Sequence, residues 1–241
     1  MSQLPSSLRR FTPARVGLGR VGTAQPSAAQ LAFNAAHAAA RDAVWSVLDV
    51  PALEAALPPP VLRVRSQARD RREYLLRPDL GRRLHPDDAA MLADHKAPGS
   101  LVFLVADGLC ATGVQAHAPA LIRAVAPLLP LPLGPVVVAA QGRVALGDAV
   151  AEALGAAAVA VLIGERPGLS AQDSLGCYLT WAPRIGRTDA ERNCISNIRP
   201  EGMPPAEAAP KLAWLVRAAM EQGETGVALK DESPNLPLLG P

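Results

Sequence analysis

One segment near the N-terminus has the spacing of a nucleotide-binding loop. Residues Gly17–Gly22 read G-x-G-x-x-G, and Asp42 follows 20 residues after the last glycine, where an acidic residue would bind the ribose of a dinucleotide. In dinucleotide-binding folds these glycines follow a buried strand and open a helix. Here residues 9–15 are polar and Asp42 falls inside a helical pattern. The context therefore argues against a bound dinucleotide, and a free-standing dinucleotide-dependent oxidoreductase is kept only as an alternative.

The histidines and cysteines lack the spacing of a metal site or a disulfide framework. The four histidines share no ligand spacing: His37, His85, His95 and His117. The three cysteines, Cys110, Cys177 and Cys194, form no C-x-x-C pair. Cys194 has polar neighbours but no adjacent base, which favours a small buried residue over a nucleophile. With no G-x-S-x-G motif either, we expect neither a catalytic residue nor a metal ligand in this chain.

A pair of opposite charges follows one of the apolar runs of the chain. Ala158–Ile163 is followed by Gly164, and then by Glu165 and Arg166. The two side chains could form a solvated ion pair. Alternatively, they could face a ligand, because ligands of open parallel sheets bind outside the carboxyl ends of the strands. The residues alone leave both interpretations open.

Four apolar runs alternate with helical stretches in the second half of the chain. The runs are Leu101–Val105, Val136–Val138, Ala158–Ile163 and Cys177–Trp181. Helices are expected up to about residue 129, from about 143 to 154 and near 205–221. This alternation predicts an α/β fold, a parallel sheet with helices on both faces. The loops expected at its carboxyl edge are Asp107-Gly108, Gln141–Val144, Gly164–Ser170 and Pro183–Asn197.

The first part of the chain differs in composition. Residues 1–83 contain 13 arginines against 6 acidic residues, whereas residues 84–241 have 11 basic and 16 acidic ones. This basic lead, with few aromatic residues, favours docking onto another chain, or weak anion binding, over nucleic-acid binding. An Ala-rich helix is expected from Ser27, and the arginine-rich residues 61–83 are expected to be solvated or to lie against a partner. We divide the chain into an N-terminal arm and helical region (1–98), an α/β domain (99–230) and a tail (231–241).

Several long motifs resemble the small (light) subunit of ethanolamine ammonia-lyase. The resemblance covers about residues 8–230. The segments that carry it are Leu8–Gly22, Leu75–Leu84, Val105–Leu109, Gln141–Asp148, Leu162–Leu169 and Cys177–Gly202. It includes the glycines of Gly17–Gly22 and so accounts for them without a dinucleotide.

The resemblance implies the fold, the activity and the cofactor. Members of this family have a Rossmann-like domain and help to bind adenosylcobalamin where they meet a large catalytic subunit, which converts ethanolamine to acetaldehyde and ammonia. The cobalamin contacts of the family map onto Val144, Glu165 and Cys194. Because the cofactor carries the difficult chemistry, a chain without a catalytic set of its own fits this role. A non-enzymatic adaptor that docks through its basic arm remains a further alternative.

The N-terminus departs from the family pattern. Many members carry a longer lead that is associated with packaging into a bacterial microcompartment, whereas the matching core here begins at about Leu8. We expect a cytoplasmic protein without a secretory signal, and its packaging into a microcompartment stays open.

Overall fold

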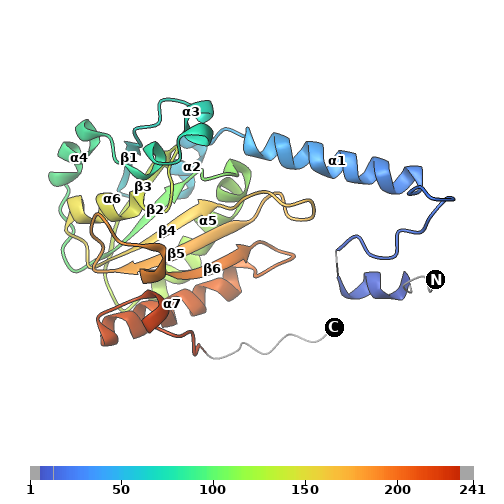
Figure 1. Ribbon diagram of the computed structural model, residues 1–241. Helices are drawn as coiled ribbons and strands as arrows, with labels where there is room; N and C mark the ends of the chain where they lie inside the picture. The colour runs from blue at the N-terminus through green and yellow to red at the C-terminus, as the bar shows by residue number, and fades with distance from the viewer. Residues whose placement is uncertain (1–5, 13, 234–241) are drawn as a thin grey trace.

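The structure is a computed structural model that describes residues 6–12 and 14–233. In this part of the chain the strands form one six-stranded sheet in the order β1-β3-β2-β4-β5-β6 (Figure 1). The strands are β1 (Val61–Arg65), β2 (Leu101–Ala106), β3 (Leu133–Ala140), β4 (Ala158–Gly164), β5 (Leu175–Trp181) and β6 (Asn193–Ile198). The four predicted apolar runs became β2, β3, β4 and β5, and the α/β class is confirmed.

Helices cover both faces of the sheet (Figure 1). They are α1 (Ser27–Val44), α2 (Val50–Ala56), α3 (Arg71–Leu76), α4 (Pro86–Ala93), α5 (Ala111–Val125), α6 (Leu146–Leu154) and α7 (Pro205–Gln222). On β2, Leu101, Phe103 and Val105 pack with α2, α5 and α7. The alternate residues Val102 and Leu104 pack with α4 and α6. Because successive side chains of a strand point to opposite faces, the unbroken apolar run of β2 reflects burial on both sides.

The expectation of an entirely parallel sheet was wrong. β1, β3, β2 and β4 are parallel, but β5 runs antiparallel to β4, and β6 runs antiparallel to β5. A parallel neighbour needs a long crossover, usually a helix, and the connection between Gly164 and Leu175 contains none. Strand β6 was not predicted at all. Its burial pattern leaves only Ile195 and Ile198 buried, so the segment has no apolar run to reveal it.

The arginine-rich residues 61–83 are more ordered than the sequence indicated. They form the edge strand β1 and helix α3, and they bury Val64 and Tyr74. Several arginines pair with nearby carboxylates: Arg63 with Glu54, Arg65 with Asp88, Arg69 with Glu73, and Arg77 with Asp79. The sheet thus takes its edge strand from the region that precedes residue 98. The alternative of a merely solvated stretch was wrong, and contact of these residues with a partner stays a prediction.

Helix α1 stands away from the rest of the molecule (Figure 1). It begins at Ser27, but Pro26 occupies the N-cap position, and Ala43 is the only residue of this described helix that is buried.

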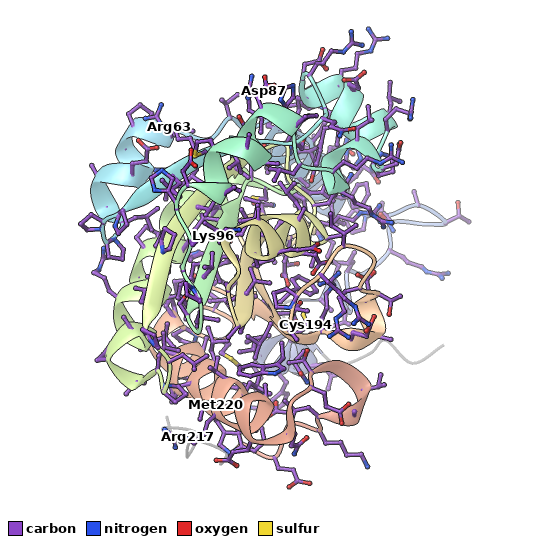
Figure 2. The ribbon with its side chains drawn as sticks, turned by 90° about the vertical axis from the view of Figure 1, so that its left-hand side faces the viewer. Arg63, Asp87, Lys96, Cys194, Arg217 and Met220 are labelled. Carbon is purple, nitrogen blue, oxygen red and sulfur yellow. The ribbon has the colours of Figure 1, made fainter. Side chains whose placement is uncertain are left out.

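At the other end of the chain, α7 packs one face on the sheet and turns Arg217 and Met220 outward (Figure 2). Asp231 of the expected tail contacts Lys211 of α7 at 2.5 Å, and residues 234–241 lie outside the described residues. Among the helices described, none combines the length and apolarity needed to cross a bilayer.

Candidate functional site

The chain reverses its direction across the sheet at β2, and a hollow lies at that point. From β2 it crosses to β3 through α5, and from β3 it crosses back over β2 to β4 through α6. In such sheets, ligands bind outside the carboxyl ends of the strands where the order reverses. A hollow of about 410 Å³ lies there, lined by Tyr74, Gly108, Leu109, Arg143, Val144, Ile163, Gly164, Glu165, Arg166 and Tyr178.

Two glycines let the loops beneath this hollow approach each other. A Cβ on Gly108, whose φ is +55°, would lie 2.3 Å from the carbonyl oxygen of Gly164. A Cβ on Gly164 would lie 2.0 Å from the carbonyl oxygen of Cys110. These distances are shorter than any van der Waals contact, so only glycine permits the β2 loop to lie on the end of β4.

A buried tyrosine forms one wall of the hollow. Arg143 lies over the Tyr74 ring at 4.2 Å, and Arg71 contacts the same ring at 5.0 Å. The Tyr74 hydroxyl donates to the carbonyl oxygen of Gly142 at 3.0 Å. Burial raises the pKa of Tyr74, so the phenol stays neutral. Tyr74 was not predicted as a site residue, because it lies within an arginine-rich stretch without apolar periodicity.

Arg71 and Asp107 join the loops behind the hollow. The Arg71 guanidinium donates to the carbonyl oxygens of Gly108 at 2.7 Å and Val44 at 2.8 Å, and it contacts the Asp107 carboxylate at 3.3 Å. Asp107 also accepts from the backbone N–H of Gly142. Burial raises the pKa of Asp107, and Arg71 opposes that rise. This network ties the end of α1 to the edge that carries the hollow.

Two of the three predicted contact residues meet in the hollow. Val144 lies on the loop after β3, and Glu165 directly follows β4. The Glu165–Arg166 ion pair, one of the two interpretations that the residues left open, does not occur among the described residues. The Glu165 carboxylate instead accepts from the backbone N–H of Asn197, at 3.1 and 3.2 Å. Glu165 therefore joins the ends of β4 and β6 while its side chain lines the hollow.

The third predicted residue lies beside the hollow rather than in its wall. Cys194 pairs with Tyr178 across β5 and β6, and Tyr178 lines the hollow. Cys194 is exposed on this outer strand (Figure 2), because β6 is an edge strand with one open side, so the expectation of a small buried residue was wrong. Partial desolvation of the sulfur still raises the pKa of the Cys194 thiol, with a hydrogen bond from Tyr178 opposing the rise. An activated nucleophile has a lowered pKa, so the thiol is not poised for nucleophilic attack.

One predicted loop belongs to the opposite edge. Trp181 pairs with Ala158 at the start of β4, so the chain leaves β5 far from the hollow. Residues 183–192 lie there, and only β6 brings Asn197 back to the carboxyl edge. The expectation that all of Pro183–Asn197 would lie at the ligand edge was wrong, because it assumed a parallel β5.

The G-x-G-x-x-G segment lacks the context of a dinucleotide site. Its glycines Gly17, Gly19 and Gly22 have positive φ values, and Val21 forms an isolated bridge with Ala24. No strand precedes the segment in the described residues, and the next helix begins only at Ser27. Asp42 lies near the end of that helix, so the two parts of the pattern do not form one site.

The protein is an α/β protein with a hollow at the carboxyl edge of its sheet. Residues 3–230 match the family model for the ethanolamine ammonia-lyase light chain. A protein of Bradyrhizobium diazoefficiens described as ethanolamine ammonia-lyase small subunit is 55% identical, with 94% of this chain and 90% of that protein covered. Two further proteins of that description, from Ralstonia nicotianae and Azotobacter vinelandii, are each 52% identical, with 97% and 94% of this chain and 90% and 87% of their own lengths covered. This chain belongs to the ethanolamine ammonia-lyase light chain family, and it is a subunit of a lyase.

The residues of the hollow fit part of a corrinoid, which has an apolar ring and a rim of amide groups. Val144, Leu109 and Ile163 supply apolar surface, and Glu165 supplies acceptors for amide N–H groups. The Nε of Arg143 is buried without a hydrogen-bond partner among the described residues, so a donor is free for an amide oxygen. A corrinoid is larger than a hollow of 410 Å³, so this chain can cover only part of it.

Proposed function

We propose that the carboxyl edge of the sheet binds adenosylcobalamin through Val144, Glu165 and Cys194, and that a large subunit covers the rest of the cofactor and carries the substrate site. The observation that carries this proposal is the open hollow in which Val144 and Glu165 meet. When bound, adenosylcobalamin supplies the radical chemistry that converts ethanolamine to acetaldehyde and ammonia. The residues of this chain bind and orient the cofactor.

Each residue has a distinct role in this proposal. A carboxylate has about four acceptor sites, and the N–H of Asn197 occupies only part of the capacity of Glu165. Glu165 can therefore also accept from amide groups of the corrin rim, while the free Nε of Arg143 donates to an amide oxygen. Val144 supplies backbone and apolar contacts, and Cys194 supplies a compact, polarizable one.

The N-terminal arm supports a heteromer. We define the arm as residues 6–44. Several of its large apolar side chains are exposed: Leu8, Phe11, Val21, Leu31 and Phe33. Several large apolar side chains exposed along one segment favour a protein interface, and the name of the family itself implies a larger partner. In this proposal the arm docks on the large subunit.

The proposal extends to fold family and location. The parallel unit of β3, β2 and β4, with α5 and α6 on opposite faces, supports a Rossmann-like domain. A cytoplasmic location is part of the same proposal.

The complex with the large subunit tests the role of Glu165. We expect Glu165→Ala to raise the apparent KM for adenosylcobalamin by about 10- to 150-fold, because a hydrogen bond to a charged group contributes roughly 1.5–3 kcal/mol. The contact is remote from the reacting atoms, so kcat at saturating cofactor should stay within about threefold. The measurement is initial rate against cofactor concentration, and the isolated chain should show no turnover.

Two variants separate cofactor binding from structural support. Arg166→Ala changes the adjacent side chain of the hollow, which makes no ion pair with Glu165 within the described ranges, and its KM should move less than that of Glu165→Ala. Glu165→Gln keeps an acceptor for Asn197 but loses the charge, and it should give an intermediate KM. An unchanged KM for Glu165→Ala would remove this residue from the cofactor site.

A further inference from the structure

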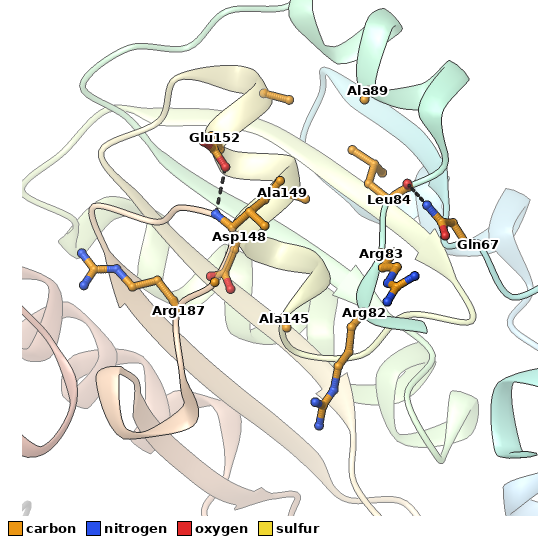
Figure 3. Close-up of a pocket in the computed structure, with 13 residues that line it drawn as sticks. Gln67, Arg82, Arg83, Leu84, Ala89, Ala145, Asp148, Ala149, Glu152 and Arg187 are labelled. Carbon is orange, nitrogen blue, oxygen red and sulfur yellow. Dashed lines mark hydrogen bonds between the residues drawn. The ribbon is translucent and has the colours of Figure 1, made fainter. Parts of the chain in front are cut away.

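A second cavity lies along helix α6, on the face of the sheet that α4 also covers (Figure 3). Its volume is about 600 Å³, within the range of sites for small molecules. It extends from Ala145, directly before α6, to the loop of residues 185–187. That loop lies at the edge of the sheet opposite to the hollow, because β5 ends at Trp181 beside the start of β4. The residues that line the two cavities do not overlap, so the second cavity is a separate site.

Small side chains of α6 form an apolar floor in this cavity. Ala145, Ala149 and Ala153 recur every four residues, so they lie on one side of the helix. Leu84 and Ile185 border the floor from two sides, and Ile185 is 73% exposed although it is a large apolar residue. The short alanines therefore leave an apolar trough between these larger side chains.

The carboxylates of the lining are held by other groups of the chain. Asp148 accepts two hydrogen bonds from the buried Arg192, at 2.7 and 2.8 Å, and its charge is thereby balanced. Glu152, in the last turn of α6, accepts from the backbone N–H of Ile185 at 2.8 Å (Figure 3). The charge of Glu152 therefore lies at the end of the cavity near Ile185. The other end, near Ala145, has no free carboxylate among the described residues of the lining.

Two arginines without an ionic partner border the end near the start of α6. Arg82 and Arg83 are exposed, and within the described ranges neither side chain forms an ion pair or a hydrogen bond. The carbonyl oxygen of Gly81 accepts from the backbone N–H of Arg143 at 2.8 Å, which fixes the two arginines beside this end of the helix. Figure 3 shows both side chains on the segment that faces α6. Guanidinium groups bind carboxylate and phosphate through charge-assisted hydrogen bonds, so the cavity combines a cationic end with an apolar trough.

We propose that this cavity binds a small organic anion, a carboxylate or phosphate attached to an apolar body. The anionic group lies at Arg82 and Arg83, and the apolar body lies on the alanines of α6. An inorganic anion would leave the trough empty, and a neutral apolar compound would leave the arginines unpaired. A protein segment is a poorer match, because a stable protein interface buries about 800 Å² on each partner, whereas these groups converge in one concave site. The proposal is independent of the function proposed for the hollow, and either can fail without the other.

Titration of the full chain with octanoate, followed by amide NMR spectra, tests the proposal and locates the site. We expect the largest shift changes at Leu84, Ala149 and Ala153, and only small ones in the arm. The neutral compound 1-octanol has the same chain length and should bind at least about tenfold more weakly, because it lacks the charge that the arginines bind. Affinity should rise up to about fourfold for each methylene added between butanoate and octanoate, because the trough buries the alkyl chain.

Matched variants separate the charge of the site from its apolar part. Arg82→Ala/Arg83→Ala should weaken octanoate binding at least about tenfold and leave the affinity for 1-octanol within about twofold. Arg72→Ala/Arg217→Ala removes the same charge from exposed arginines outside the cavity, and octanoate binding should stay within about twofold. Ala149→Phe fills the trough and should weaken binding of both compounds. Because Arg82 and Arg83 make no side-chain bonds in the part of the chain described, their replacement should not alter folding, which circular dichroism checks.

Other outcomes overturn the inference. Shift changes confined to the arm would mean that octanoate binds only the exposed apolar side chains there, and the absence of saturable binding would leave the cavity without this ligand. An arginine variant that binds octanoate as tightly as the wild type would also contradict it. Calorimetric titration of the complex with the large subunit completes the test. Retained octanoate binding supports a small-molecule site, whereas its loss would assign the cavity to the subunit interface.

Discussion

Helix α1 and the sheet differ in what holds their apolar side chains. On the sheet, Leu104 is fully buried between β-strand neighbours and α6, and its burial takes place within this chain. On α1, Leu31 is 67% exposed. Both are leucines in regular secondary structure, but only one of them contributes burial energy to the fold of this chain.

This contrast indicates where the stability of the chain resides. The apolar faces of the sheet are covered on both sides, whereas α1 is held at its C-terminal end, where Arg71 donates to the carbonyl oxygen of Val44. Helical stability in proteins comes mainly from packing of one face. We therefore predict that the arm packs against a partner, and that the sheet and its helices fold without one.

The largest expected effect concerns a buried ion pair of the sheet region. Asp148→Ala would leave the Arg192 guanidinium buried without its main countercharge, and only Thr180, a carbonyl oxygen and the exposed Asp189 would still contact it. Breaking such a pair costs about 3–5 kcal/mol. Urea unfolding of the chain should show this loss. Asp189→Ala removes the exposed partner of the same arginine. If it lowered the free energy of unfolding by more than about 1 kcal/mol, the difference that we expect between the buried and the exposed partner would be contradicted.

The same substitution in the two regions gives the next largest difference. We expect Leu104→Ala to lower the free energy of unfolding by about 2–5 kcal/mol, because it leaves a cavity in a packed core. Leu31→Ala should change it by less than about 0.5 kcal/mol. Parallel urea titrations measure both. If the two variants lost similar stability in the isolated chain, α1 would have to pack against the sheet.

The N-terminal caps of α3 and α1 also differ, and we expect this difference to have a smaller effect on stability. The Asp70 side chain accepts from the backbone N–H of Glu73 and caps α3, whereas α1 has no side-chain cap bond in the described structure. We expect Asp70→Ala to destabilise the chain by about 0.5–2 kcal/mol. Ser27→Ala, at the start of α1, should have no measurable effect. Thermal unfolding of both variants tests this, and a loss with Ser27→Ala would reveal a cap that the structure lacks.

The smallest expected effect depends on pH. Hydrogen bonds from the Thr188 backbone and from Arg187 lower the pKa of Glu191 from its ordinary value of 4.5 to about 2. A depressed carboxylate pKa contributes stability that is present above the unfolded value and is lost as pH falls. The Tm difference between wild type and Glu191→Gln should therefore shrink between pH 4.5 and pH 2. Glu224→Gln, which loses no side-chain bond in the described region, is the control. If the Tm difference between wild type and Glu191→Gln stayed constant over this pH range, the lowered pKa of Glu191 would not contribute to stability.

Local sequence patterns were enough to predict the central strands of the sheet. The strands β2 and β4 are apolar throughout because both of their faces are buried, and such a run is visible without knowledge of the fold. The edge strands β1 and β6 were not visible, because each is partly exposed and polar. Val144, Glu165 and Cys194 came from the resemblance to a family rather than from the chemistry of their neighbours, and their roles stay predictions.

Tertiary structure alone decided how the site is assembled. The sequence places Glu165 and Arg166 side by side, yet the folded chain gives Glu165 the backbone of Asn197 as its partner. Tyr74 and Gly142 are far apart in sequence, and their hydrogen bond exists only because α3 packs beside the loop after β3. Arg82 and Arg83 resemble every other exposed arginine until the fold places them next to an apolar cavity. The apolar pattern of a strand is local because burial acts on each side chain, whereas a site depends on contacts between distant segments, which exist only after the chain has folded.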